Sequence, residues 1–191
     1  MFMRPIKKTQ LAIAVVLALW IAPGRAFAQE PDTGIRLEEL FAELAEPGRD
    51  DWQRIEAEIA RIWSQSGSEA MDMLLQRGND AMERQDLKGA VGHYSALTDH
   101  APEFAEGWNA RATAYYHMGE YALSVSDIER VLALNPMHFG ALWGLASILE
   151  EIGEIELSLE ALQAVKALTP NRPNVDDTIR RLERATGDTE L

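Results

Sequence analysis

The sequence predicts an all-α solenoid, in which pairs of helices stack on one another and helical caps cover the two ends. The first observation is that Pro102, Pro136 and Pro170 stand 34 residues apart. The second is that the segments leading to these prolines share one pattern of large and small residues with the periodicity of two amphipathic helices. A period of this length is that of a stacked helix pair, and the stacked surface is typical of binding rather than of chemistry.

The chain begins with the features of a secretory signal peptide, residues 1–28. Basic residues precede an apolar run at 11–22, and small residues suit cleavage after Ala28. This run is shorter than the roughly 20 residues that span a bilayer, although an uncleaved anchor is the alternative. We expect export to the periplasm or, alternatively, secretion. No stable membrane insertion after cleavage and no disulfide are expected, since the chain has no cysteine.

Residues 29–34 contain a proline and a glycine and are expected to form a flexible lead-in segment. Apolar residues then recur at helical spacing on both sides of a Pro-Gly pair in 35–66, which predicts two amphipathic helices. Because solenoids need terminal units that cover their core, we interpret this region as an N-terminal cap or a degenerate repeat. Trp52 and Trp63 are expected in its core, with an exposed docking patch as the alternative.

Three repeats follow, at residues 71–104, 105–138 and 139–172. Their eighth residue is small in every copy, which lets two helices approach closely: Gly78, Ala112 and Ala146. In the second and third copies Gly119 and Gly153 stand between the two helices, where a residue that tolerates positive φ ends the first helix. The first copy has Gln85 there.

These positions resemble the tetratricopeptide repeat family, whose pattern is W-x2-L-G-x2-Y, then G, then A-x3-F, then A and P. The second copy agrees best, and Arg111 and Ser124 are its departures from the pattern. Its residues at the pattern positions are Trp108, Ala112, Tyr115, Gly119, Tyr121, Ile128 and Pro136. The resemblance covers about 102 residues and implies a right-handed superhelix of helix pairs, with a concave groove that usually binds a peptide or a protein.

The resemblance also implies that the first helix of each repeat lines this groove. The candidate partner-binding residues on these helices are Leu75, Asn79, Met82, Asn109, Thr113, Tyr116, His117, Trp143, Ser147 and Glu150. Their amides could bond a peptide backbone, their aromatic rings could anchor a partner, and Glu150 could select a basic side chain. Alternatively, Trp143 packs between repeats and Asn109 only faces solvent. The groove positions hold no Lys or Arg, so a clamp for a terminal carboxylate is not expected.

Residues 173–186 predict a C-terminal capping helix, and 187–191 a frayed tail. Proline opens this helix and acidic residues occupy its first turn, where they complement the helix dipole. Ile179 and Leu182 are expected to face the third repeat.

The chain carries 31 acidic and 18 basic residues, and loss of the four basic residues in 1–28 would leave a net charge of −17. Such a charge repels nucleic acid and anionic membranes, and indicates either a basic partner or simple solubility. The sequence has no phosphate loop, nucleophile motif or histidine pair with metal-binding spacing. We therefore expect a non-enzyme without catalytic residues, metal or cofactor. Its expected role is a cell-envelope adaptor for a protein segment or, alternatively, a structural protein that self-associates through its solenoid ends.

Overall fold

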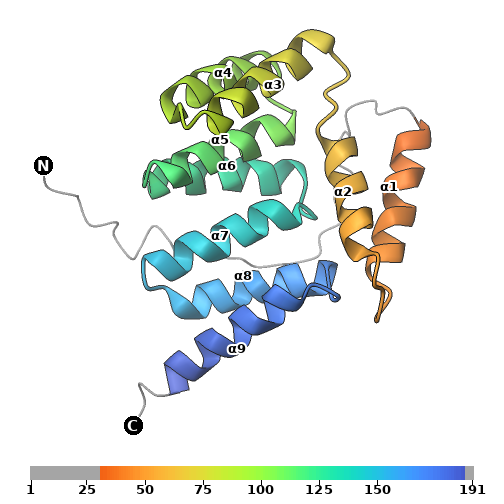
Figure 1. Cartoon of the computed structure of the whole chain (residues 1–191), viewed down its shortest axis with the longest axis vertical. Coiled ribbons are helices and arrows are strands. Elements are labelled where there is room, and N and C mark those ends of the chain that lie inside the picture. The colour runs from red at the N-terminus through yellow and green to blue at the C-terminus, as the bar shows by residue number, and fades with distance from the viewer. Residues whose placement is uncertain (1–30, 188–191) are drawn as a thin grey trace, which may run out of the picture.

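The computed structural model describes residues 31–187. Within this range the chain has the predicted all-α solenoid fold, with stacked helices and no strands (Figure 1). The predicted signal peptide, 1–28, and the last residues of the predicted tail, 188–191, lie outside the described residues. Among the described helices, none is both long and apolar enough to cross a membrane.

The chain starts with a helical hairpin made of α1 (Pro31–Leu44) and α2 (Trp52–Trp63). Residues 31–34, expected to be flexible, instead form the first turn of α1. A proline fits this turn because the first amide of a helix lacks an intrahelical acceptor. Five apolar side chains of the hairpin are buried: Leu40, Leu44, Ile55, Ile59 and Ile62.

Three helix pairs follow the hairpin. The helices are α3 (Glu69–Glu83), α4 (Leu87–His100), α5 (Ala105–His117), α6 (Tyr121–Leu134), α7 (Phe139–Glu151) and α8 (Ile155–Leu168). The first helices α3, α5 and α7 contact one another along the stack. This contact brings the candidate groove positions into one layer.

The turns inside the second and third pairs have the positive φ that the sequence predicted. Gly119 and Gly153 have φ values of 73° and 81°, and Gln85 takes the same place in the first pair at φ 59°. A side chain in this region is strained, because Cβ approaches the following carbonyl oxygen. The first turn therefore contains a local strain that the other two avoid.

Small residues let the two helices of a pair pack closely. A Cβ atom added to Gly78 would lie 2.1 Å from the ring of Tyr94 on the partner helix. In the second pair the hydroxyl of Ser124 donates to the carbonyl oxygen of Ala112 at 2.8 Å, and Ser158 repeats this bond to Ala146 in the third. Ser124 thus fits its buried position because its hydroxyl has an acceptor.

The last helix, α9 (Pro173–Gly187), covers the third repeat. Val175, Ile179 and Leu182 are buried in one cluster with Leu142 and Leu162. The hydrophobic contact is continuous from α7 and α8 into α9, so α9 belongs to the same packed unit as the third pair.

The N-terminal hairpin does not lie where an N-terminal cap would lie. Its buried face contacts Phe139 at the start of α7 and Leu168 at the end of α8, and not the first pair (Figure 1). The linker after α2 turns at Gly67, at φ 78°, which lets the hairpin run beside the stack. The expected cap at the first repeat is therefore wrong in its position, because apolar contacts far along the chain direct the hairpin elsewhere.

Candidate partner-binding groove

Two of the predicted contact residues belong to the core of the first repeat. Leu75 is 5% exposed and lies in a cluster with Tyr94 and Leu97. Met82 packs against the same cluster. The prediction that a partner contacts Leu75 is therefore wrong, since α4 and α5 cover this apolar side chain.

The ninth positions of the first helices are polar and face solvent to different degrees. Asn79 and Thr113 are exposed, and Ser147 is half-buried. The Asn79 oxygen accepts a hydrogen bond from the Tyr94 hydroxyl at 2.7 Å, which leaves the amide nitrogen of Asn79 free to donate to a partner. Burial raises the pKa of Tyr94 to about 12, so its hydroxyl remains a donor at neutral pH.

Thr113 and Ser147 each donate to a carbonyl one turn earlier in their own helix. The acceptors are the carbonyl oxygens of Asn109 and Trp143, at 3.0 Å in both cases. Their hydroxyl oxygens keep free lone pairs. The layer therefore offers both donors and acceptors, which an extended peptide backbone requires.

Asn109 is half-buried and is held in place by a neighbouring carboxylate. Its amide nitrogen donates to Glu106 at 3.1 Å, and the second oxygen of Glu106 lies 3.1 Å from Nε2 of His138. Nδ1 of His138 accepts from the backbone N–H of Ala141, so Nε2 carries the hydrogen and donates to Glu106. The alternative that Asn109 only faces solvent does not describe this arrangement.

The hairpin adds an aromatic contact to this hydrogen-bonded chain. Trp63 stacks on the ring of His138, with centroids 4.5 Å apart and planes 20° apart. Trp63 is half-buried among the apolar residues of the hairpin, so it is not an exposed docking residue. The groove residue Asn109 is thereby connected to the hairpin through Glu106 and His138.

Tyr116 and His117 stand at the end of α5. Tyr116 is half-buried beside Tyr121, with ring centroids 5.7 Å apart, and it packs against the core of the second repeat. His117 is exposed, and its ring meets Tyr116 edge-on at 5.6 Å. His117 can contact a partner without any change in the core.

Glu150 is paired within the chain. Both of its oxygens accept from Arg181 on α9, at 2.6 Å and 2.9 Å. The hydrogen bonds from Arg181 lower the pKa of Glu150, whose charge is thus compensated by a neighbour. This pairing argues against the expectation that Glu150 selects a basic side chain of a partner.

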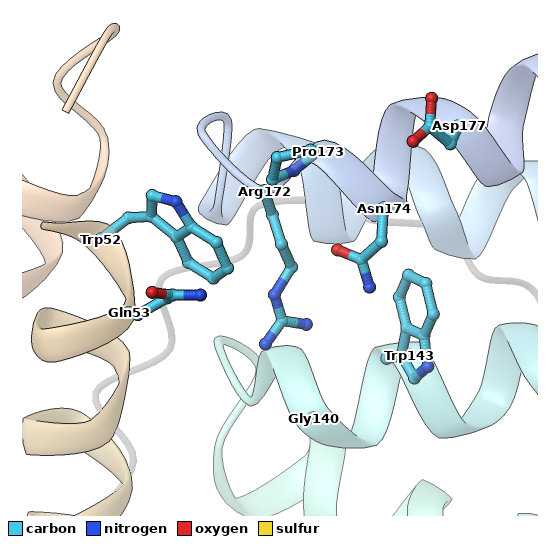
Figure 2. Close-up of a pocket in the computed structure, with 8 residues that line it drawn as sticks. All are labelled: Trp52, Gln53, Gly140, Trp143, Arg172, Pro173, Asn174 and Asp177. Atoms are coloured by element: carbon cyan, nitrogen blue, oxygen red, sulfur yellow. The ribbon is translucent and has the colours of Figure 1, made fainter. Parts of the chain in front are cut away.

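Trp143 both packs against the core of the third repeat and lines an open cavity of about 730 Å³. Figure 2 shows this cavity between α2, α7 and the start of α9. We call it the α2–α7–α9 cavity, and its main lining residues are Trp52, Gln53, Gly140, Trp143, Arg172, Asn174 and Asp177. The cavity continues the surface formed by the first helices as far as the hairpin.

Arg172 lies between the hairpin and the third repeat. Nη2 of Arg172 donates to Glu56 of α2 at 2.6 Å, and the guanidinium lies over the rings of Phe139 and Trp143, at 5.6 Å and 6.0 Å from their centroids. Glu56 is 7% exposed, and among the described residues its Oε1 has no hydrogen-bond partner. Burial raises the pKa of Glu56, while Arg172 opposes this shift.

Sequence reasoning missed most of this cavity. Pro173 starts α9 where the first helix of a fourth repeat would start. Asn174 and Asp177 therefore stand at the second and fifth positions of that helix, which are groove positions, and this signal was available in the sequence. Trp52 and Gln53 had no such signal, because their approach depends on the position of the hairpin. No group of His, Asp and Glu side chains within 31–187 is arranged to hold a metal ion.

The stacked helix pairs define this chain as an α-solenoid of repeated helix hairpins. The family model described as "Tetratricopeptide repeat" matches residues 75–127 and 110–173. A TPR repeat-containing protein of Rhizobium etli is 36% identical over 148 residues, which make up 77% of this chain and 72% of that protein. The chain belongs to the tetratricopeptide repeat family.

Two other similar proteins match a smaller part of this chain. Mouse protein unc-45 homolog B is 30% identical over 112 residues, yet the match spans 57% of this chain and 12% of that protein. Among solved structures, the first TPR of Spaghetti (RPAP3) bound to the HSP90 peptide SRMEEVD superposes with a TM-score of 0.59 at 21% identity. That match covers 61% of this chain and 93% of the other. At this identity, the likeness shows the fold alone.

Proposed function

We propose that this chain is a non-catalytic adaptor that binds a protein segment along the layer formed by α3, α5 and α7, after export to the periplasm. Membership of the tetratricopeptide repeat family supports an interaction role. A domain of the same fold, the first TPR of Spaghetti (RPAP3), is bound to a peptide of HSP90. The amino-terminal sequence pattern of residues 1–28 supports export.

One observation carries the proposal. Successive first helices present exposed polar side chains, with Asn79 on α3 and Thr113 and His117 on α5, and none of the three is needed to fill the core. Free donors and acceptors in such a row can pair with the backbone of an extended segment. The predicted basic partner rests on the net charge of the chain and not on Glu150, because Arg181 already pairs with Glu150.

The decisive experiment is affinity capture from an envelope extract with the chain from Gln29 to Leu191. Thr113→Arg puts a long charged side chain into the groove without touching the core, since Thr113 is exposed. Ser126→Arg on α6 is the matched control, because it makes the same change in charge at an exposed position of a second helix. We expect capture of a partner by the parent chain and by Ser126→Arg, and its loss in Thr113→Arg.

Equal capture by both variants would contradict binding at the groove and favour the second candidate, self-association through the ends of the stack. The position of the hairpin favours this candidate, since it leaves the first repeat uncovered and Met73 on α3 is 53% exposed. An apparent mass that rises with protein concentration in sedimentation would then identify self-association.

A further inference from the structure

We propose that the α2–α7–α9 cavity anchors the bound segment by taking an acidic side chain together with an adjacent aromatic or long aliphatic side chain. The inference rests on the proposed function, because it assumes that a protein segment occupies the groove. It adds the chemistry of the residue pair that the groove recognises.

The walls of the cavity suit a large apolar side chain. Trp52 of α2 and Trp143 of α7 enter the cavity from opposite sides, as Figure 2 shows. Both are half-buried, so their bodies are fixed by packing while part of each surface remains open. Rigid indole surfaces of this kind often provide the dominant contacts of an interface. The volume of about 730 Å³ falls in the range of roughly 300–1,000 Å³ that is typical of ligand pockets.

Arg172 supplies the positive charge. Its guanidinium lies between the two indoles in Figure 2. Among the described residues that line the cavity, Arg172 is the only one with a cationic side chain. One N–H of Nη2 donates to Glu56, whereas Nε and Nη1 have no hydrogen-bond partner within the described chain, so the second N–H of Nη2 can form a fork with one of them. An arginine with free donors on its fork binds a carboxylate through parallel hydrogen bonds.

The nearby acids do not exclude a second carboxylate. Asp177 at the rim accepts a hydrogen bond from Arg180, which compensates its charge. Glu56 competes for Arg172, but it is buried with one oxygen unpaired, so its charged form is poorly stabilised. The exposed amides of Gln53 and Asn174 add donors and acceptors for the backbone on either side of the anchor.

This subsite differs from a clamp built on groove positions of the first helices. Its cation comes from the loop before α9, and one of its walls comes from the hairpin. The cavity is open, and its hydrogen-bonding amides lie on two different elements, Gln53 on α2 and Asn174 on α9. A chain that passes through the cavity can use both, and the ligand group is therefore a side-chain carboxylate rather than a chain end.

The test is an NMR titration of the mature chain with the capped peptide acetyl-Gly-Phe-Glu-Gly-amide. The indole N–H signals of Trp52 and Trp143 are the reporters, each assigned by its Trp→Phe variant. Saturable shifts of both signals are expected with this peptide. The counterparts with Gln or Lys in place of Glu should bind at least about tenfold more weakly, because neither can pair bidentately with Arg172.

Three variants separate the charge of Arg172 from its structural contacts. Arg172→Gln should weaken binding of the Phe-Glu peptide by about tenfold or more. Glu56→Gln should strengthen it several-fold, because the competing carboxylate is gone while an acceptor for Nη2 is kept. Loss of the hairpin would weaken binding in both variants, so opposite effects exclude that explanation. Arg130→Gln, which removes an exposed guanidinium paired with Glu103, is the control and should change nothing.

Several results would overturn the inference. They are equal or tighter binding of the Lys peptide, shifts that leave both indoles unaffected, unchanged affinity in Arg172→Gln, and binding only of a peptide with a free terminal carboxylate. The proposed function fails separately. If Thr113→Arg loses the captured partner while Arg172→Gln retains it, the groove function holds and the anchor subsite is wrong. If partner capture survives in Thr113→Arg, the groove function itself is wrong.

Discussion

The two helical elements that flank the repeats are attached to them in different ways. α9 joins the third repeat through a continuous apolar contact, in which Val175, Ile179 and Leu182 are buried with the core residues of α7 and α8. The hairpin has an apolar core of its own, to which, among the described residues, the stack contributes only Phe139 and Leu168.

Much of the remaining attachment of the hairpin is polar or aromatic. Asn171, in the loop before α9, bonds three backbone groups of the α1–α2 turn. Arg172 pairs with Glu56, and Trp63 stacks on His138. Each hydrogen bond contributes a net stabilisation of about 0.5–1.5 kcal/mol, which is less than the stabilisation from a buried leucine side chain. The comparison indicates that α9 unfolds together with the third repeat, whereas the hairpin can open locally while the stack stays folded.

The largest effect is expected from an apolar deletion in α9. Leu182 is 2% exposed in the core of the third repeat, and Leu182→Ala should cost about 3 kcal/mol of global stability through lost transfer energy and the cavity left behind. Urea denaturation followed by circular dichroism measures this loss as a lower midpoint.

The control for this experiment is Leu123→Ala on α6, where the leucine is 47% exposed and little packing is lost. It should leave the midpoint nearly unchanged. If Leu182→Ala instead opens only α9 while the midpoint of the remaining helices stays the same, then α9 is attached as loosely as the hairpin and the comparison fails.

The repeats were predictable because the contacts that define them are local and periodic. Gly119 and Gly153 mark turns, and Ala112 and Ala146 mark close helix contacts, with partners inside the same repeat. The sequence predicts the structure at these positions because each turn or helix contact involves residues only a few tens of positions apart. The family resemblance, rather than this periodicity, placed Asn79, Thr113 and His117 on the groove side of the first helices, and all three are exposed.

Arg111 shows what a pattern misses. At a position that the family pattern reserves for leucine, it donates two hydrogen bonds to Asp127 of α6 at 2.7 Å and 2.8 Å, and a further bond to Thr98 of α4. The third repeat has Leu145 and Ala161 at the corresponding positions. The second repeat thus has a paired charge where the third has two apolar residues, and one departure read alone does not reveal its compensation.

The cavity was not predictable for a different reason. Its wall on α2 depends on contacts between residues more than 100 positions apart, such as the bond from the Gly48 amide to Asn171 at 2.7 Å. No local periodicity encodes which surface an amphipathic hairpin covers. A hairpin with one apolar face could cover the first repeat or the third equally well by its pattern alone.

A smaller effect, confined to the hairpin, is expected from Asn171→Ala. Its side chain bonds the carbonyl oxygens of Leu44 and Glu46 and the amide of Gly48, so the variant should weaken hairpin docking by about 1–2 kcal/mol. Hydrogen exchange should become faster in α1 and α2 and stay unchanged in α7 and α8. Asn135→Ala, which removes a local bond before α7, is the matched control. Equal acceleration in α7 and α8 would mean that the hairpin and the stack open as one unit.

The smallest effect concerns the pH dependence of hairpin docking through Glu56. Burial raises the pKa of Glu56 in the folded chain, so its contribution to docking is complete below the ordinary glutamate pKa and is lost as pH rises through the raised value. Glu58 and Glu150, whose pKa values are lowered by Arg36 and Arg181, act in the opposite sense, so the parent chain alone gives a mixed profile. The difference between the parent chain and Glu56→Gln isolates the buried carboxyl. Hydrogen exchange of α2 should show the parent hairpin gaining protection relative to Glu56→Gln as pH falls through this window. A constant difference across the window would mean that Glu56 does not change its protonation there, which contradicts the prediction.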